Sequence, residues 1–217
     1  MLKKTRILFL IIFLLILNSC IGISADIVMR KDGSGKISLE YRFSRMAEVL
    51  GRLDGNENWH IIPTGRADIE RTVARIPDMR LVSFSSRDGD KEIVNKAELE
   101  FKNTEALLAF LDPSGRRASL SRGNGSNSLT VIIMEPPSVA MNADLLDLVQ
   151  QVSSGYELKL SFSANGNSAM TLSDGIGKTA EPPRGAKIVS SGKKVSLEMG
   201  TGDILGLKQG LGVSFNW

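Results

Sequence analysis

The chain has 217 residues, with 27 Lys and Arg against 24 Asp and Glu, one His and one Cys. Lys3, Lys4 and Arg6 lie in the first 19 residues, which contain no acid, so residues 20–217 balance 24 basic against 24 acidic side chains. A neutral chain lacks the net basic surface that nucleic acid requires. A single histidine also excludes a two-histidine metal site. We therefore expect no nucleic-acid partner, no metal and no cofactor.

The first 19 residues have the order of a secretory signal peptide. A basic cluster precedes an unbroken apolar run over residues 7–17, and Asn18 and Ser19 follow it. A helix of this run is only about 17 Å long, well short of the ~30 Å hydrocarbon core of a bilayer. We predict that residues 1–19 are a removed signal and not a transmembrane anchor.

Leu17, Asn18, Ser19 and Cys20 resemble the lipobox of bacterial lipoproteins. The resemblance implies cleavage before Cys20, a diacylglycerol on its thiol and an acyl chain such as palmitate on the new amino terminus. Asn18 departs from the small or β-branched residue that is usual there. Two or three acyl chains, at ~0.8 kcal/mol per buried CH2, hold a protein firmly on a membrane. The implied location is the inner or outer membrane of the envelope, facing the periplasm. The alternative is an ordinary signal peptide with a chance cysteine.

Alternation of apolar and polar side chains is the main structural signal after the signal peptide. It predicts strands with one buried and one solvent-exposed face. These strands lie over residues 37–43, 96–102, 156–163, 195–199 and 211–217. Residues 129–134 are apolar at odd and even positions alike, apart from Thr130, which predicts a central strand covered on both faces.

Turns and helices complete the expected fold. Turn-forming pairs predict hairpins at Asp32-Gly33, Asp88-Gly89, Asn124-Gly125 and Asn165-Gly166. Helical spacing with polar caps predicts about four amphipathic helices, over residues 46–53, 69–76, 107–111 and 145–152. This order favours an α+β fold with an antiparallel sheet built from hairpins. Residues 37–122 fit a ferredoxin-like βαββαβ unit extended by carboxyl-terminal strands. We expect residues 20–25 to form a lipidated tether and residues 26–217 a single envelope domain.

Two short motifs resemble functional sequences but lack essential residues. The turn after Arg30 resembles a calcium-binding loop, yet Arg30 and Tyr41 stand where the loop needs an acid and a bidentate Glu. Residues 177–179 end like a phosphate-binding loop, but Pro182 and Pro183 stand where such a loop continues into a helix. We interpret both motifs as turns.

His60 is the one obvious candidate for acid–base chemistry, and it lies beside Trp59. We interpret it as a structural or surface histidine. Glu98 and Glu100 alternate with apolar residues and are expected to be solvated. The sequence contains no assembled catalytic constellation, which favours a protein that is not an enzyme.

The two ends of the mature chain are similar to LppM-like envelope lipoproteins. The similarity covers residues 26–35, residues 187–197 and the closing Asn216-Trp217. The family implies a non-enzymatic α+β envelope domain, with glycolipid binding proposed for one member. That member has a carboxyl-terminal membrane helix, and this chain departs from it there.

These observations favour a membrane-anchored, non-enzymatic envelope lipoprotein. Its expected partners are the membrane, through Cys20, and a lipid, glycolipid or envelope protein held in an apolar groove between helices and sheet. One alternative is an envelope hydrolase that uses His60 or a carboxylate as its base. The other is a purely structural lipoprotein.

Overall fold

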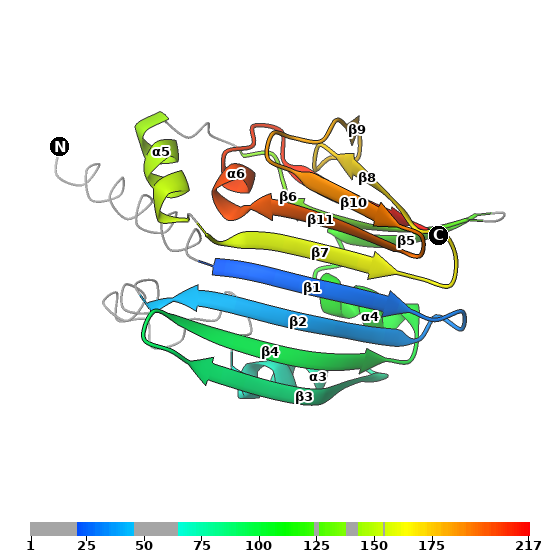
Figure 1. Ribbon diagram of the computed structural model, residues 1–217. Helices are drawn as coiled ribbons and strands as arrows, with labels where there is room; N and C mark the ends of the chain where they lie inside the picture. Colours follow the sequence, from blue (N-terminus) through cyan, green and yellow to red (C-terminus); the bar gives the residue numbers. More distant parts are fainter. Residues whose placement is uncertain (1–20, 46–64, 124–125, 138–142, 154) are drawn as a thin grey trace.

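Two β-sheets and a few short helices make up the part of the chain described by the computed structural model (Figure 1). The described residues are 21–45, 65–123, 126–137, 143–153 and 155–217. The seven-stranded sheet has the order β10 (Lys187–Ser191), β11 (Lys194–Gly200), β7 (Glu157–Ser163), β1 (Ile21–Met29), β2 (Gly35–Ser44), β4 (Glu92–Phe101) and β3 (Met79–Asp88). The five-stranded sheet has the order β5 (Ala118–Arg122), β6 (Asn127–Met134), β12 (Leu211–Asn216), β8 (Ala169–Ser173) and β9 (Thr179–Ala180). The helices are α3 (Arg66–Val73), α4 (Thr104–Leu111), α5 (Ala143–Val152) and α6 (Thr201–Leu205).

The α+β class is confirmed, but the expectation of one antiparallel sheet is wrong. The strands divide between two sheets, and β1 and β7 pair as parallel neighbours. All other pairs are antiparallel.

Alternation along β2 and β4 determines which face of the seven-stranded sheet is buried. Ile37, Leu39 and Tyr41 on β2 are at most 7% exposed, and Leu99 on β4, the partner of Ile37, is fully buried. Since successive side chains on a strand point to opposite faces, the charged residues between them form the solvent face. The alternating positions that are buried in both strands are therefore those that the sequence predicts.

One hydrophobic core contains side chains of both sheets. The Phe162 ring on β7 lies 5.1 Å from the ring of Phe215 on β12 and 4.8 Å from that of Trp217, measured between centroids. Ile69 on α3 and Leu107 on α4 are 1% exposed and belong to the same core. In Figure 1, α3 and α4 lie behind the seven-stranded sheet, opposite its solvent face.

Gly35 at the start of β2 permits a close approach that any side chain would prevent. A Cβ atom there would lie 2.1 Å from the Val28 carbonyl oxygen and 2.4 Å from Cζ of Phe101. The glycine thus lets the buried Phe101 ring cover the end of the β1–β2 hairpin.

The hairpin predictions have different outcomes. Asp32-Gly33 joins β1 to β2 and Asp88-Gly89 joins β3 to β4, as predicted. Asn124-Gly125 lies outside the described residues, although the flanking strands β5 and β6 do pair. The prediction of a hairpin at Asn165-Gly166 is wrong, because the flanking strands β7 and β8 belong to different sheets.

The ferredoxin-like unit over residues 37–122 is also wrong. Strands β2, β4 and β3 lie side by side as that fold requires, but β5 pairs with β6 in the second sheet. The place beside β2 that β5 would fill is taken by β1.

The structure describes three helices of eight to ten residues and not the four expected amphipathic helices. They are α3, α4 and α5, which match three of the predicted segments, and Asn103 caps α4 by accepting from the Ala106 N–H at 2.9 Å. The helix predicted over residues 46–53 lies outside the described residues. The five-residue α6 was not expected.

Two further expectations concern single strands. Residues 21–25 were expected to form a tether, but they are the first half of β1, paired with β2 from Ile21 opposite Phe43 onward. Strand β6 is interior, between β5 and β12, as expected for residues 129–134. It is only half-buried apart from Leu129, so the expected cover on both faces is incomplete.

Candidate functional site

The two residues to which the sequence assigns chemistry, Cys20 and His60, lie outside the described residues. Ile21, the residue that follows Cys20 in the sequence, is the first residue of β1. Ile21 is 7% exposed and pairs with Phe43, and its carbonyl oxygen accepts a hydrogen bond from the Thr201 hydroxyl at 3.1 Å. The chain therefore passes from Cys20 into a fixed central strand of the seven-stranded sheet without a linker.

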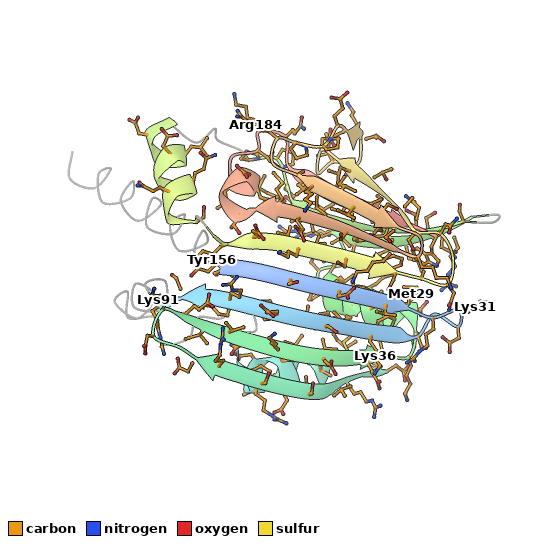
Figure 2. The ribbon with its side chains drawn as sticks, in the orientation of Figure 1. Met29, Lys31, Lys36, Lys91, Tyr156 and Arg184 are labelled. Atoms are coloured by element: carbon orange, nitrogen blue, oxygen red, sulfur yellow. The ribbon has the colours of Figure 1, made fainter. Side chains whose placement is uncertain are left out.

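The solvent face of this sheet is built from the polar positions of its alternating strands. Figure 2 shows it with Tyr156 and Lys91 at the end where β1 begins and Lys36 toward the opposite end. Strand register places Lys159, Ser24, Glu40 and Lys96 in one row across β7, β1, β2 and β4. Glu40 thus lies beside Lys96 on the neighbouring strand, and in a second row Glu100 lies between Lys36 and Arg80.

Ion pairs connect side chains across this face, six of them between neighbouring strands, one within β7 and one from β11 over β7 to β1. They are Lys159 with Glu157 and Glu198 (3.1 and 3.6 Å), Lys96 with Glu40 (2.8 Å), Arg42 and Arg87 with Glu92 (2.8 and 3.5 Å), Lys36 and Arg80 with Glu100, and Lys194 with Asp26 (2.8 Å). Pairing of this kind leaves a surface that is polar and close to electrically neutral.

The ion pairs shift the pKa values of two side chains, Glu100 and Lys159, in the direction that keeps each side chain charged. Hydrogen bonds from Arg80 and then Lys36 lower the pKa of Glu100. The hydrogen bond with Glu157 and the charges of Glu157 and Glu198 raise the pKa of Lys159. Both shifts keep the side chain charged, so these groups are suited to hydrogen bonding and not to proton transfer near neutral pH. The expectation of a solvated side chain is confirmed for Glu98, which is exposed, whereas Glu100 on the same face is partly covered and ion-paired with Lys36 and Arg80.

Two hollows lie side by side on the solvent face. One, of about 310 Å3, lies over β2, β4 and β3, and the other, of about 290 Å3, lies over β7, β1 and β2. Glu40 and Arg42 line both, so the hollows form one groove across the strands. Gly22 and Ser24 line the part of the groove nearest to the start of β1. Volumes of this size are at the lower limit for small-ligand sites.

The groove can hold a ligand by hydrogen bonds but not by burial of apolar groups. Its lining is dominated by the charged side chains of Glu40, Arg42, Lys96 and Lys159, and Val94 and Ile23 are the apolar exceptions. It therefore differs in character from the apolar groove that was expected between helices and sheet.

The motifs that resemble functional sequences are turns, as interpreted from the sequence. In the β1–β2 turn the Asp32 carboxylate accepts from the Ser34 N–H at 3.0 Å and the Ser34 hydroxyl at 2.7 Å. Both hydrogen bonds lower the pKa of Asp32, and the bond from the Ser34 hydroxyl has the larger effect. Residues 177–179 lead into β9 and not into a helix. Within the described residues, no cluster of three or more His, Cys, Asp or Glu side chains could hold a metal ion.

Sequence reasoning did not identify the groove, although it placed Glu40, Arg42, Lys96 and Lys159 on the solvent-exposed faces of strands. Gly22 and Ser24 were assigned to the tether, yet residues 21–27 alternate apolar odd positions with small or polar even ones. That alternation was the signal for β1. The approach of Lys159 to Ser24 required knowledge that β7 pairs with β1, which no local pattern provides.

Comparisons of the chain with family models, with curated proteins and with solved structures give no match. The similarity to LppM-like lipoproteins and the lipobox thus remain predictions from the sequence. In the described part of the chain, no helix is both long and apolar enough to cross a membrane.

Proposed function

We propose that this chain is an exported, non-enzymatic envelope lipoprotein, anchored by lipid on Cys20, which binds a neutral glycolipid headgroup in the groove of its seven-stranded sheet. The observation that carries the proposal is the start of β1 at Ile21, one residue after the anchor. A lipid on Cys20 brings the Gly22–Ser24 part of the groove next to the membrane that holds the lipid.

The chemistry of the groove favours a neutral, hydroxyl-rich ligand. Glu40 offers acceptors and Arg42, Lys96 and Lys159 offer donors, while their ion pairs leave little net charge to attract an ionic ligand. Sugar hydroxyls both donate and accept hydrogen bonds, so they can bind to such alternating groups. An acyl chain has no comparable partners there.

The anchor is tested by mass spectrometry of the native protein extracted from membranes. The expected mature amino terminus is Cys20, with the mass of a diacylglycerol and an acyl chain added. A Cys20→Ser variant is expected to leave the membrane fraction, because the lipid chains supply the attachment. An unmodified Cys20, or a mature terminus at another residue, would contradict the proposal.

Ligand binding is tested by native mass spectrometry of the full mature protein in mild detergent, with glycolipid purified from its own envelope. Arg42→Ala is expected to lose most of the bound glycolipid, because Arg42 lines both hollows. Arg80→Ala is the matched control, since Arg80 lies on the same face and pairs with a β4 glutamate but lines neither hollow. Equal binding by both variants would exclude the groove as the site.

A further inference from the structure

The end of the seven-stranded sheet where β1 begins is a defined surface of the molecule. It contains the starts of β1 and β7, the ends of β2 and β11, and the β3–β4 turn. Figure 2 shows Tyr156 and Lys91 at this end, whereas Lys31 lies in the β1–β2 turn at the opposite end. Strand β1, of nine residues, separates the two ends by about 30 Å at ~3.3 Å per residue.

The length of chain between the anchor and the sheet leaves almost no freedom. Consecutive Cα atoms are about 3.8 Å apart, so a lipid on Cys20 is attached one residue from Ile21, which lies at this end. Ile21 is itself fixed by its pairing with Phe43 and by the Thr201 hydroxyl. A domain on a flexible linker could adopt any orientation, but this one has no linker within which to turn.

The side chains at this end are compatible with lipid headgroups. In the β3–β4 turn and at the end of β2, the basic Arg45 and Lys91 balance the acidic Asp88 and Asp90. Tyr156 is half-buried at the start of β7, and tyrosine is a residue that is enriched at membrane–water interfaces. The β3–β4 turn is held in place, because the Arg45 N–H donates to the Lys91 carbonyl at 3.0 Å and the Arg45 side chain pairs with Asp88.

From these observations we infer that this end of the sheet rests on the lipid surface, with the strands rising away from the membrane and the β1–β2 turn about 30 Å above it. The inference rests on the proposed lipid anchor at Cys20. It places the Gly22–Ser24 part of the groove at headgroup level, where a glycolipid of the same membrane reaches it.

Fluorescent labels at the two ends test the orientation. Lipidation uses the only cysteine, so Lys91→Cys and Lys31→Cys each provide one reactive thiol in the mature protein. The two positions are matched, since both are exposed lysines in turns at opposite ends of the same sheet. The full lipidated protein is placed in phosphatidylcholine vesicles that contain a nitroxide quencher on the headgroups.

The label at position 91 is expected to lose most of its fluorescence to the quencher, and the label at position 31 almost none. Equal quenching at the two positions, or stronger quenching at position 31, overturns the inference. Mass spectrometry of the same samples reports lipidation of Cys20, so failure of the anchor is distinguished from failure of the orientation.

A linker variant provides a second measurement that does not depend on the label sites. Ten Gly and Ser residues inserted between Cys20 and Ile21 give a linker with a root-mean-square length of about 17–19 Å. The domain can then rotate, so the difference in quenching between positions 91 and 31 is expected to fall sharply. If the difference persists unchanged, the direct connection is not what orients the domain.

Discussion

The two faces of the seven-stranded sheet are formed by alternate residues of the same strands, and they have opposite properties. On β4, Leu99 is fully buried between Ile37 and Leu81, whereas its neighbour Glu98 is exposed on the other face. Burial of a leucine side chain contributes about 1.5–3 kcal/mol, but an exposed ion pair contributes only about 0–1 kcal/mol. The fold is therefore stabilised from one face, and the other face can vary its charges to suit a partner.

Truncation of adjacent residues on β4 gives the largest contrast between the faces. Leu99→Ala is expected to lower the free energy of unfolding by about 2–5 kcal/mol, because it leaves a cavity at a fully buried position. Glu98→Ala is expected to change it by less than about 0.5 kcal/mol, since an exposed side chain has few contacts to lose. Urea denaturation measures both, with Trp217 fluorescence as the probe, since that ring contacts the core at Phe162. Similar losses for the two variants would break the comparison.

Asp112 extends the comparison to a carboxylate on the buried side. It is 6% exposed and follows α4, where the chain crosses from the first sheet to the second. Its oxygens accept from the Ser114 N–H and hydroxyl (3.0 and 2.5 Å) and from the N–H groups of Arg117 and Ala118. Burial alone would raise the pKa of Asp112, but these hydrogen bonds together outweigh it and hold the pKa well below its usual range.

We expect Asp112→Asn to lower the Tm by several degrees near neutral pH, because an amide NH2 would face donors that now meet a carboxylate oxygen. The folded-state pKa is depressed, so this stabilisation is present above the unfolded pKa of about 3.9 and is lost as the pH falls below it. The difference in Tm between wild type and variant should therefore shrink as the pH is lowered from 7 toward 3. Calorimetry across this range provides the measurement, and a difference that grows toward acid pH would show the assignment to be wrong.

The smallest effect is expected for an ion pair on the solvent face. Glu40 and Lys96 are 2.8 Å apart and their side chains are 33% and 62% exposed. A double-mutant cycle with Glu40→Gln and Lys96→Met is expected to give a coupling of about 0.2–1 kcal/mol that decreases with salt. A coupling above about 2 kcal/mol would mean that this face also stabilises the fold.

Local patterns in the sequence predicted what is local in the structure. Alternation identified β2, β4, β7, β11 and β12, and helical spacing identified α3, α4 and α5. The alternation of β1 was also readable, but its first residues, 21–25, were assigned to a tether because they follow the predicted cleavage site.

The division into two sheets could not be read from such patterns. The pair Asn165-Gly166 is typical of a hairpin turn, but here the chain is held by the β10–β11 turn instead. The Ala164 N–H donates to the Lys193 carbonyl at 3.4 Å, and the Ser168 N–H donates to the Gly192 carbonyl at 3.2 Å. These partners are more than 20 residues away in sequence. The groove depends on the same kind of distant pairing, between β1 and β7, so its location required the structure.

The place of β1 in the sheet also determines how the molecule bears mechanical force. Strand β1 lies between β2 and β7, and its ladder with β2 runs along its whole length while its ladder with β7 covers residues 23–28. A pull on the amino end acts along the strand axis, so it shears both ladders at once instead of opening them one bond at a time. The domain is therefore expected to resist extraction by its amino end much more strongly than removal of the edge strand β10 from the side. This resistance would suit the anchor proposed at Cys20, through which any force on the domain would act.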